Sequence, residues 1–247
     1  MPPVPHIRWH IIEGAAGCAY ARERGLVAVV VDALRASATA AMLFDAGATE
    51  ILAVREVSDA HAARPGFSGA LLYGERGGLP PEGFDFGNSP RTVEAARGRR
   101  VIFTTTTGAG RLLDCWGAEA AYMGSTVNAA AVVRAAASHE KDVVLIPAGL
   151  VSDPFFNAQE DWTAAAAVAM RSGHAIGQGA AAFDAWRKRI EAEGLEALFQ
   201  SAPHAEKLRR VGLEADISYC AQMDLTAAVP KAVKRHRFGV ILQNAAP

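Results

Sequence analysis

The stretch LVAVVVDALRAS, residues 26–37, joins a continuous apolar run to a polar turn. The apolar part, residues 26–31, is typical of a strand buried on both faces, because a strand with one wet face alternates apolar and polar residues. Residues 35–44 then predict a helix that ends before Gly47, and residues 51–54 predict the next strand. The stretch therefore predicts a β-α-β unit, the repeating element of a parallel sheet.

The same alternation of apolar runs and helical segments continues along the chain. The expected strands are 7–12, 26–31, 51–54, 101–103, 120–123, 143–147 and 238–242. The expected helices are 35–44, 110–116, 129–138 and 162–170. Similar endings, GATE at 47–50 and GAE at 117–119, fit either an internal duplication or two units that obey the same rules.

We therefore expect an α/β fold of three layers, α/β/α, with a mostly parallel sheet built from repeated βα units. Residues 179–213 predict an added helical segment near the C-terminus that packs on the sheet, closes over it or forms a dimer face. No long polar linker interrupts residues 1–247, so we expect a single domain. A homodimer is expected, since symmetric dimers are the commonest soluble assembly.

Charge and composition argue against several classes of function. The chain has 25 Lys and Arg against 26 Asp and Glu, which gives no reason to expect nucleic acid or an acidic membrane surface as a partner. No apolar run approaches the roughly 18 residues that a membrane-spanning helix needs. Residues 1–6 lack the pattern of a signal peptide. The three cysteines form no CxxC pair and indicate buried thiols in a reduced, cytoplasmic protein.

Polar residues follow three of the expected strands, at residues 32–37, 104–110 and 148–161. Ligands of open parallel sheets bind beyond the carboxyl ends of the strands, so these turns form the candidate site. A fourth block, residues 74–90, is rich in Gly and Pro, and a purely structural loop would not need its combination of polar groups. Those groups are Glu75, Arg76, Asp85, Asn88 and Ser89.

Asp32 directly follows the first buried strand, where a carboxylate is placed to hold a hard cation such as Mg²⁺. It is equally suited to cap the N-terminus of the next helix. The planar guanidinium of Arg35 suits phosphate or carboxylate, and therefore predicts an anion site. The alternative is a structural ion pair between Arg35 and Asp32.

Two further turns carry similar alternatives. TTTTGAG at 104–110 combines hydroxyl residues with glycines, which allows backbone amides to approach an anion at a helix N-terminus; the alternative is a Thr-rich strand end with a glycine turn. It is not a nucleotide P-loop, because no Lys follows the glycines. Glu160 and Asp161 open a helix, where paired carboxylates complete a Mg²⁺ site or orient a water. The alternative is a capping box from Asn157 to Glu160.

In order and spacing, these motifs resemble those of the 2-phosphosulfolactate phosphatase family. They are DALRAS at 32–37, GERGG at 74–78, GFDFGNSP at 83–90, TTTTG at 104–108, GSTVNA at 124–129 and ED at 160–161. The likeness covers about residues 27–230, nearly the whole chain. It implies an α/β/α, Mg²⁺-dependent phosphomonoesterase that converts 2-phospho-3-sulfolactate to 3-sulfolactate and phosphate, in the route to coenzyme M.

Carried over to this chain, the resemblance implies a set of site residues, and side-chain chemistry then suggests their roles. The catalytic candidates are Asp32, Glu75 and Arg76. The substrate-binding candidates are Arg35, Asn88, Ser89, Thr104, Thr105, Thr106, Thr107, Gly108 and Asn128. The candidate Mg²⁺ ligands are Asp32, Glu160 and Asp161.

In the expected reaction, Glu75 positions the water or protonates the leaving oxygen, while Arg35 and Arg76 neutralise charge on the phosphoryl oxygens. A covalent phosphate on Asp32 is not expected. Aspartate-nucleophile phosphatases of the haloacid dehalogenase type carry a second Asp two residues further on, and here that position is Leu34.

The chain departs from the family pattern in two places. The family turn usually reads TTTNGT, whereas Thr107 and Ala109 here replace the Asn and the last Thr; residues 151–159 also differ. Both changes lie where substrate is expected to contact the protein. The substrate is therefore 2-phospho-3-sulfolactate or another phosphorylated hydroxy acid. The alternative from a different class is a non-catalytic protein that binds a phosphorylated metabolite.

Overall fold

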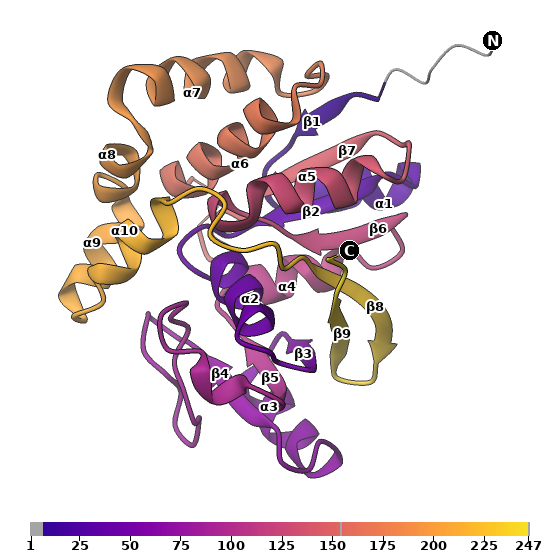
Figure 1. Cartoon of the computed structure of the whole chain (residues 1–247), viewed down its shortest axis with the longest axis vertical. Helices are drawn as coiled ribbons and strands as arrows, with labels where there is room; N and C mark the ends of the chain where they lie inside the picture. The colour runs from indigo at the N-terminus through magenta and orange to yellow at the C-terminus, as the bar shows by residue number, and fades with distance from the viewer. Residues whose placement is uncertain (1–6, 154, 247) are drawn as a thin grey trace.

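One β-sheet runs through the residues that the computed structural model describes, 7–153 and 155–246 (Figure 1). In that part of the chain its strands are β1 (Trp9–Ile11), β2 (Val27–Val31), β3 (Glu50–Val54), β4 (Leu71–Gly74), β5 (Arg100–Thr104), β6 (Ala120–Met123), β7 (Val143–Pro147), β8 (Pro230–His236) and β9 (Gly239–Asn244). They lie in the order β1-β7-β2-β6-β8-β9-β3-β5-β4.

The sheet consists of two parallel sections separated by an antiparallel hairpin. Strands β1, β7, β2 and β6 pair in parallel, as do β3, β5 and β4. Strands β8 and β9 pair antiparallel with each other, with β6 on one side and with β3 on the other. Three antiparallel pairings in succession make the two parallel sections run in opposite senses. The expected α/β fold with a mostly parallel sheet is confirmed, and the hairpin is an addition to it.

Helices lie against both faces of the sheet (Figure 1). Those between the strands are α1 (Gly14–Arg24), α2 (Ala36–Asp45), α3 (Val57–Ala63), α4 (Gly108–Asp114), α5 (Ala129–Ala137) and α6 (Gln159–Ser172). The expected helical segment contains α7 (Ala180–Glu193), α8 (Leu195–Gln200) and α9 (Pro203–Arg210), and α10 (Ala215–Ala221) follows it. Gln159 donates its side-chain amide to the Leu198 carbonyl at 2.7 Å, which fixes α8 beside the turn that follows β7.

Strand β2 shows why its apolar run matters for the fold. Alternate residues of the strand belong to two different cores. Val27, Val29 and Val31 pack in the core that contains residues of α5 and α6. Ala28 and Val30 pack in the core that contains residues of α1 and α4. Because all five residues are fully buried, helices must cover both faces of this section, which gives the three layers.

The expected elements agree with the observed ones to within three residues at each end. The sequence did not predict α1, α3, α10, β4 or β8. Strand β8, PKAVKRH, is mostly half-buried or exposed, so it lacks an apolar pattern. The single domain stays a prediction, and residues 1–6, considered above for a signal peptide, lie outside the described residues. No helix in the described ranges combines the length and apolar character needed to cross a membrane.

Replacing Gly239 by Ala tests the contact between the hairpin and β3. An ideal Cβ at Gly239 would lie 1.9 Å from the Ala53 carbonyl oxygen, so β9 would have to move away from β3. We expect Gly239→Ala to lower the free energy of unfolding by about 2 kcal/mol or more in urea denaturation. Gly66→Ala is the control, because a Cβ there meets nothing within 4 Å. Equal stability of the two variants would contradict this account.

Candidate active site

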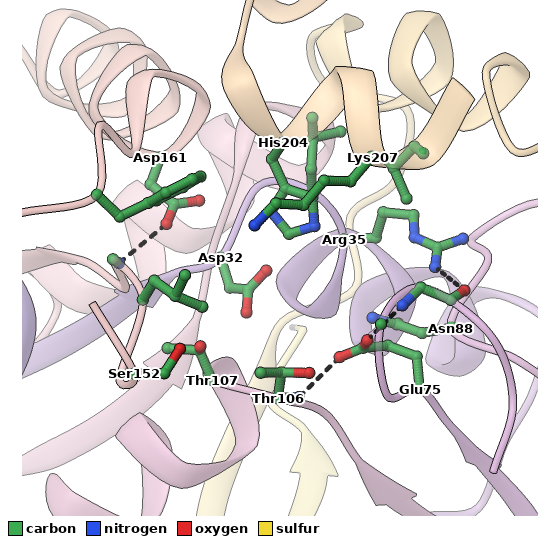
Figure 2. A pocket seen from close by; sticks show the side chains of 17 residues that line it. Asp32, Arg35, Glu75, Asn88, Thr106, Thr107, Ser152, Asp161, His204 and Lys207 are labelled. Atoms are coloured by element: carbon green, nitrogen blue, oxygen red, sulfur yellow. Dashed lines mark hydrogen bonds between the residues drawn. The ribbon is translucent and has the colours of Figure 1, made fainter. Parts of the chain in front are cut away.

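A cavity of about 220 Å³ lies where turns of the two parallel sections meet (Figure 2). Its walls come from the turns after β2, β4, β5 and β7, and from helix α9. Ligand-binding turns at the carboxyl ends of strands therefore converge from both sections, although the sections run in opposite senses. The predicted residues that line the cavity are Asp32, Arg35, Glu75, Asn88, Thr106, Thr107 and Asp161.

Asp161 connects two of these turns through its carboxylate. Oδ1 accepts the amide N–H of Ala33 at 2.8 Å, and Oδ2 accepts the amide N–H of Gly149 at 3.1 Å. Asp32 accepts the amide N–H of Ala36, the first residue of α2, through Oδ1 at 3.1 Å, but the N-cap position that one alternative gave it belongs to Arg35. The two carboxylates are thus held rigidly by backbone amides at the carboxyl ends of β2 and β7.

Burial makes the ionised forms of both carboxylates costly. It raises the pKa of Asp32 to about 6, and the nearby charges of Glu75 and Glu160 act in the same direction. Burial also raises the pKa of Asp161 well above its usual range, with further contributions from Glu160 and Asp32. The cluster therefore concentrates negative charge that the surrounding protein does not balance.

His204 lies beside this cluster. Its Nδ1 lies 3.4 Å from Oε1 of Glu160. Burial alone would lower the pKa of His204, but the carboxylates of Glu160, Asp32 and Glu75 outweigh it and raise the pKa. The other oxygen of Glu160, Oε2, is buried without a hydrogen-bond partner among the described residues. The alternative of a capping box from Asn157 to Glu160 is wrong, because α6 begins at Gln159 without a side-chain cap.

Glu75 lines the cavity, but backbone amides occupy both of its oxygens. Oε1 accepts the amide N–H of Thr106 at 2.7 Å, and Oε2 accepts the amide N–H of Gly78 at 2.9 Å. The carboxylate therefore connects the turns after β4 and β5 (Figure 2). Glu75 therefore holds these two turns in place, and its expected role as acid or base stays a prediction.

Arg35 forms a buried ion pair with Asp216, a residue of α10. Its Nη1 donates to Asp216 Oδ2 at 2.6 Å, and both side chains are 2% exposed. The other terminal nitrogen, Nη2, donates to the Gly78 carbonyl at 2.9 Å. The alternative of an ion pair between Arg35 and Asp32 is therefore wrong. Arg35 lines the cavity with its charge largely neutralised by Asp216, which also anchors α10 to the site.

The side chains available for binding a metal ion or a polar ligand differ in kind. Within the described ranges, no three side chains of His, Cys, Asp or Glu are grouped so as to enclose a metal ion by themselves. Asn88 is 3% exposed and its Oδ1 has no hydrogen-bond partner among the described residues, although the side chain lines the cavity. An amide left open in this way is suited to a polar ligand.

Comparison with known proteins places this chain in a family. The family model described as 2-phosphosulpholactate phosphatase matches residues 18–235, most of the chain. The chain belongs to the 2-phosphosulfolactate phosphatase family. This family consists of phosphoric monoester hydrolases by its description, so the resemblance found in the sequence motifs is confirmed.

Curated relatives of this family align over most of their length. A protein of Deinococcus radiodurans is 36% identical over 216 residues, which cover 84% of this chain and 88% of the relative. One of Gloeobacter violaceus is 34% identical over 226 residues, covering 89% and 92%. One of Carboxydothermus hydrogenoformans is 33% identical over 207 residues, covering 82% and 84%. All three are named "Probable 2-phosphosulfolactate phosphatase".

Several motif residues of the family do not reach the cavity in this chain. Arg76 donates to the carbonyls of Glu75 and Arg55 at 2.7 and 2.8 Å, and to the Thr104 hydroxyl at 3.1 Å. The Thr104 hydroxyl in turn donates to the Arg55 carbonyl at 3.0 Å. Because these bonds use the polar groups of Arg76 and Thr104, their expected contact with substrate is corrected to a role in holding the turns together.

The same correction applies to Ser89 and Asn128. The Ser89 hydroxyl donates to Asp216 Oδ1 at 2.8 Å and so supports the partner of Arg35. Asn128 is fully buried, accepts the Ser125 amide N–H at 2.9 Å and donates to the Ala228 carbonyl at 2.9 Å. These bonds attach the C-terminal part of the chain to the turn after β6.

Two residues of the Thr-rich turn act just outside the cavity wall. The Thr105 hydroxyl accepts the amide N–H of Ala109 at 3.0 Å and caps the start of α4. An ideal Cβ at Gly108 would lie 2.5 Å from Asp32 Oδ2, so the glycine allows α4 to approach the carboxylate closely. Ala109, one of the departures from the family pattern, is fully buried beside them and does not line the cavity.

The sequence motifs gave no indication of three residues that the fold brings to the site. These are His204 and Lys207 on α9, and Asp216 on α10. The histidines have no metal-ligand spacing in the sequence, and nothing in the spacing of Asp216 connects it with Arg35. The i, i+3 spacing of His204 and Lys207 places them on one side of a helix, which is the only local signal.

Asp32→Asn tests the electrostatic cost of the cluster. The asparagine keeps an oxygen for the Ala36 amide but removes the buried charge. In metal-free protein at pH 7.5 we expect the free energy of unfolding to rise by as much as about 3 kcal/mol, the value of a pKa raised from 3.8 to about 6. A folded-state pKa above the unfolded one penalises the wild type above pH 6 and not below pH 4. The gain should therefore disappear at pH 4 in urea denaturation with EDTA.

Asp216→Asn provides the matched contrast, since it also neutralises a buried aspartate. It leaves the Arg35 guanidinium buried without a counter-charge, so we expect the free energy of unfolding to fall by about 3 kcal/mol or more. The same urea denaturation measures both variants. Stability changes of the same sign in Asp32→Asn and Asp216→Asn at pH 7.5 would contradict the roles given to the two carboxylates.

Proposed function

We propose that this chain is a Mg²⁺-dependent phosphatase that hydrolyses the phosphate monoester of a small acidic metabolite, with 2-phospho-3-sulfolactate as the substrate. Membership of the family and the names of its relatives support the substrate. The observation that carries the mechanism is the pair Asp32 and Asp161, two carboxylates held by backbone amides at the floor of the cavity.

The residues at the floor fit Mg²⁺. The ion prefers oxygen ligands, takes one or two carboxylates and keeps several waters, so it does not need three protein side chains. Among the ion pairs of the described residues, none involves Asp32 or Asp161. The neighbouring Glu160 pairs with His204 through Oε1 and leaves Oε2 without a hydrogen-bond partner. Asp32 and Asp161 would hold the ion. When bound, Mg²⁺ would polarise the phosphoryl group and lower the pKa of a bound water.

Residues around the floor would bind the phosphoryl oxygens, donate a proton to the leaving group and hold the turns in place. Thr106 and Thr107 line the wall that faces α9 and would donate hydrogen bonds to phosphoryl oxygens (Figure 2). His204 lines the opposite wall, is held by Glu160 and would donate a proton to the leaving oxygen. Glu75 would keep the turns after β4 and β5 in register around the phosphoryl group. The acid role expected for Glu75 thus passes to His204 in this proposal.

A second candidate substrate class is another phosphorylated hydroxy acid. The two departures from the family pattern both contribute to the cavity wall. The residues concerned are Thr107 in the first departure, and Ser152 and Phe156 in the second. Differences at these positions alter the surface that a substrate touches without altering Asp32 or Asp161. This alternative keeps the same chemistry and changes only the group attached to the phosphate.

Three further proposals accompany this function. A cytoplasmic location is supported by three cysteines that are all free and buried. A place in the route to coenzyme M follows from the proposed substrate. A homodimer is supported by α7, on which Phe183 and Trp186 are only half-buried. Sedimentation of the purified protein would decide its oligomeric state.

The assay is phosphate release from 2-phospho-3-sulfolactate and a panel of phosphorylated hydroxy acids, with Mg²⁺ and with EDTA. We expect turnover that requires Mg²⁺, because the acidic floor repels a phosphate dianion until a cation is bound. Asp161→Asn should lower kcat by about 100-fold or more, while Asp184→Asn, on the exposed side of α7, serves as the control.

Three results would count against parts of this proposal. Turnover unaffected by EDTA would contradict the Mg²⁺ dependence. Turnover of a different phospho-acid only would favour the second substrate class. Absence of turnover together with binding of a phospho-acid would favour the non-catalytic binding protein.

A further inference from the structure

Lys207 lies at the rim of the cavity, opposite the turns that carry Thr106 and Thr107. Figure 2 shows its long side chain and that of His204 reaching from α9 over the cavity. Lys207 is exposed, whereas Asp32 and Asp161 at the floor are 9% and 4% exposed. A ligand whose phosphate reaches the floor must therefore extend its other groups towards Lys207.

The aromatic ring of Phe156 holds the ammonium of Lys207 in place. Nζ of Lys207 lies 4.7 Å from the centroid of the Phe156 ring, within the range of a cation–π contact. The same ring packs edge-on against His204, with the ring centroids 6.5 Å apart and an interplanar angle of 83°. Phe156 thus restricts where the ammonium lies without neutralising its charge.

Lys207 has no carboxylate partner within salt-bridge distance among the described residues. Its neighbour Glu206 pairs with Arg209 at 3.6 Å and with Arg210 at 3.2 Å. Two other cationic side chains line the cavity, and both are already paired: Arg35 with Asp216, and His204 with Glu160. Lys207 is therefore the lining cation whose full charge remains open to an anion at the rim.

We propose that Lys207, held against Phe156, binds the second acid group of the substrate, a carboxylate or sulfonate beside the phosphate ester. This inference rests on the proposed function, because it assumes that the phosphate occupies the floor. It makes Lys207 a specificity-determining residue, which selects phosphate monoesters that carry an additional anionic group. Since Phe156 belongs to residues 151–159, the departure from the family pattern there sets the position of the selecting charge.

Lys207→Met tests this directly. The substrates are 2-phospho-3-sulfolactate and phenyl phosphate, which has no acid group besides its phosphate. We expect KM for the phospho-acid to rise about 10- to 100-fold with little change in kcat, the effect of losing one charge-assisted contact. The ratio of kcat/KM for the phospho-acid to that for phenyl phosphate should fall by about the same factor. Lys207→Arg, which keeps the charge, should restore the ratio to within about three-fold of wild type.

Arg210 provides a matched control for Lys207, and Phe155 provides one for Phe156. Arg210→Met removes an exposed cation of the same helix that does not line the cavity, so the ratio should stay at the wild-type value. Phe156→Ala should raise KM for the phospho-acid about 3- to 10-fold, because the ammonium loses its fixed position. Phe155→Ala, at a residue that is 95% exposed, should leave KM unchanged.

Each outcome decides the matter. An equal fall in kcat/KM for both substrates in Lys207→Met would show that the lysine binds the phosphate and not the second acid group. An unchanged kcat/KM for both substrates would show that the lysine binds neither group. Either result would overturn the proposal. If the wild type hydrolyses no phospho-acid, the proposed function fails, and calorimetric titration with 3-sulfolactate still tests the inference. A weaker affinity in Lys207→Met by about 10-fold would then support it, and equal affinity would overturn it.

Discussion

The hydrogen bonds from backbone amides to the Asp161 carboxylate hold together the turns after β2 and β7. Glu75 does the same for the turns after β4 and β5, which belong to the other parallel section. Each carboxylate thus spans two chain segments that are distant in sequence. Because hydrogen bonds from amides to a carboxylate are strong and directional, these few contacts help to fix the cavity walls.

This way of building the site concentrates negative charge at its floor. Asp32 and Asp161 keep their places although burial raises the pKa of each, and His204 balances only part of the charge through Glu160. Natural proteins accept such local instability where function requires it. A cation that binds the folded state and not the unfolded one would stabilise this chain by mass action, so metal supply and folding would be linked.

The sequence predicted the layers and most strands, because runs such as 26–31 can be satisfied only by burial on both faces. It could not predict β8, which is half-exposed and polar, or the reversal of one section that follows from it. The motifs correctly predicted that Asp32, Glu75 and Asp161 lie at one cavity. Arg76, Ser89 and Asn128 belong to the same motifs, but their hydrogen bonds hold turns together. Residue type and spacing do not distinguish a polar group that meets a ligand from one that satisfies buried backbone. His204 and Lys207 depend on how α9 packs, which only tertiary structure decides.

The hairpin of β8 and β9 has a consequence for synthesis of the chain. It comes after all the other strands, yet it lies between β6 and β3 in the middle of the sheet. A ribosome therefore delivers both parallel sections before the strands that unite them, and each section first presents an open edge to other chains. The cavity, whose walls come from both sections, is therefore among the last parts of the molecule to be completed.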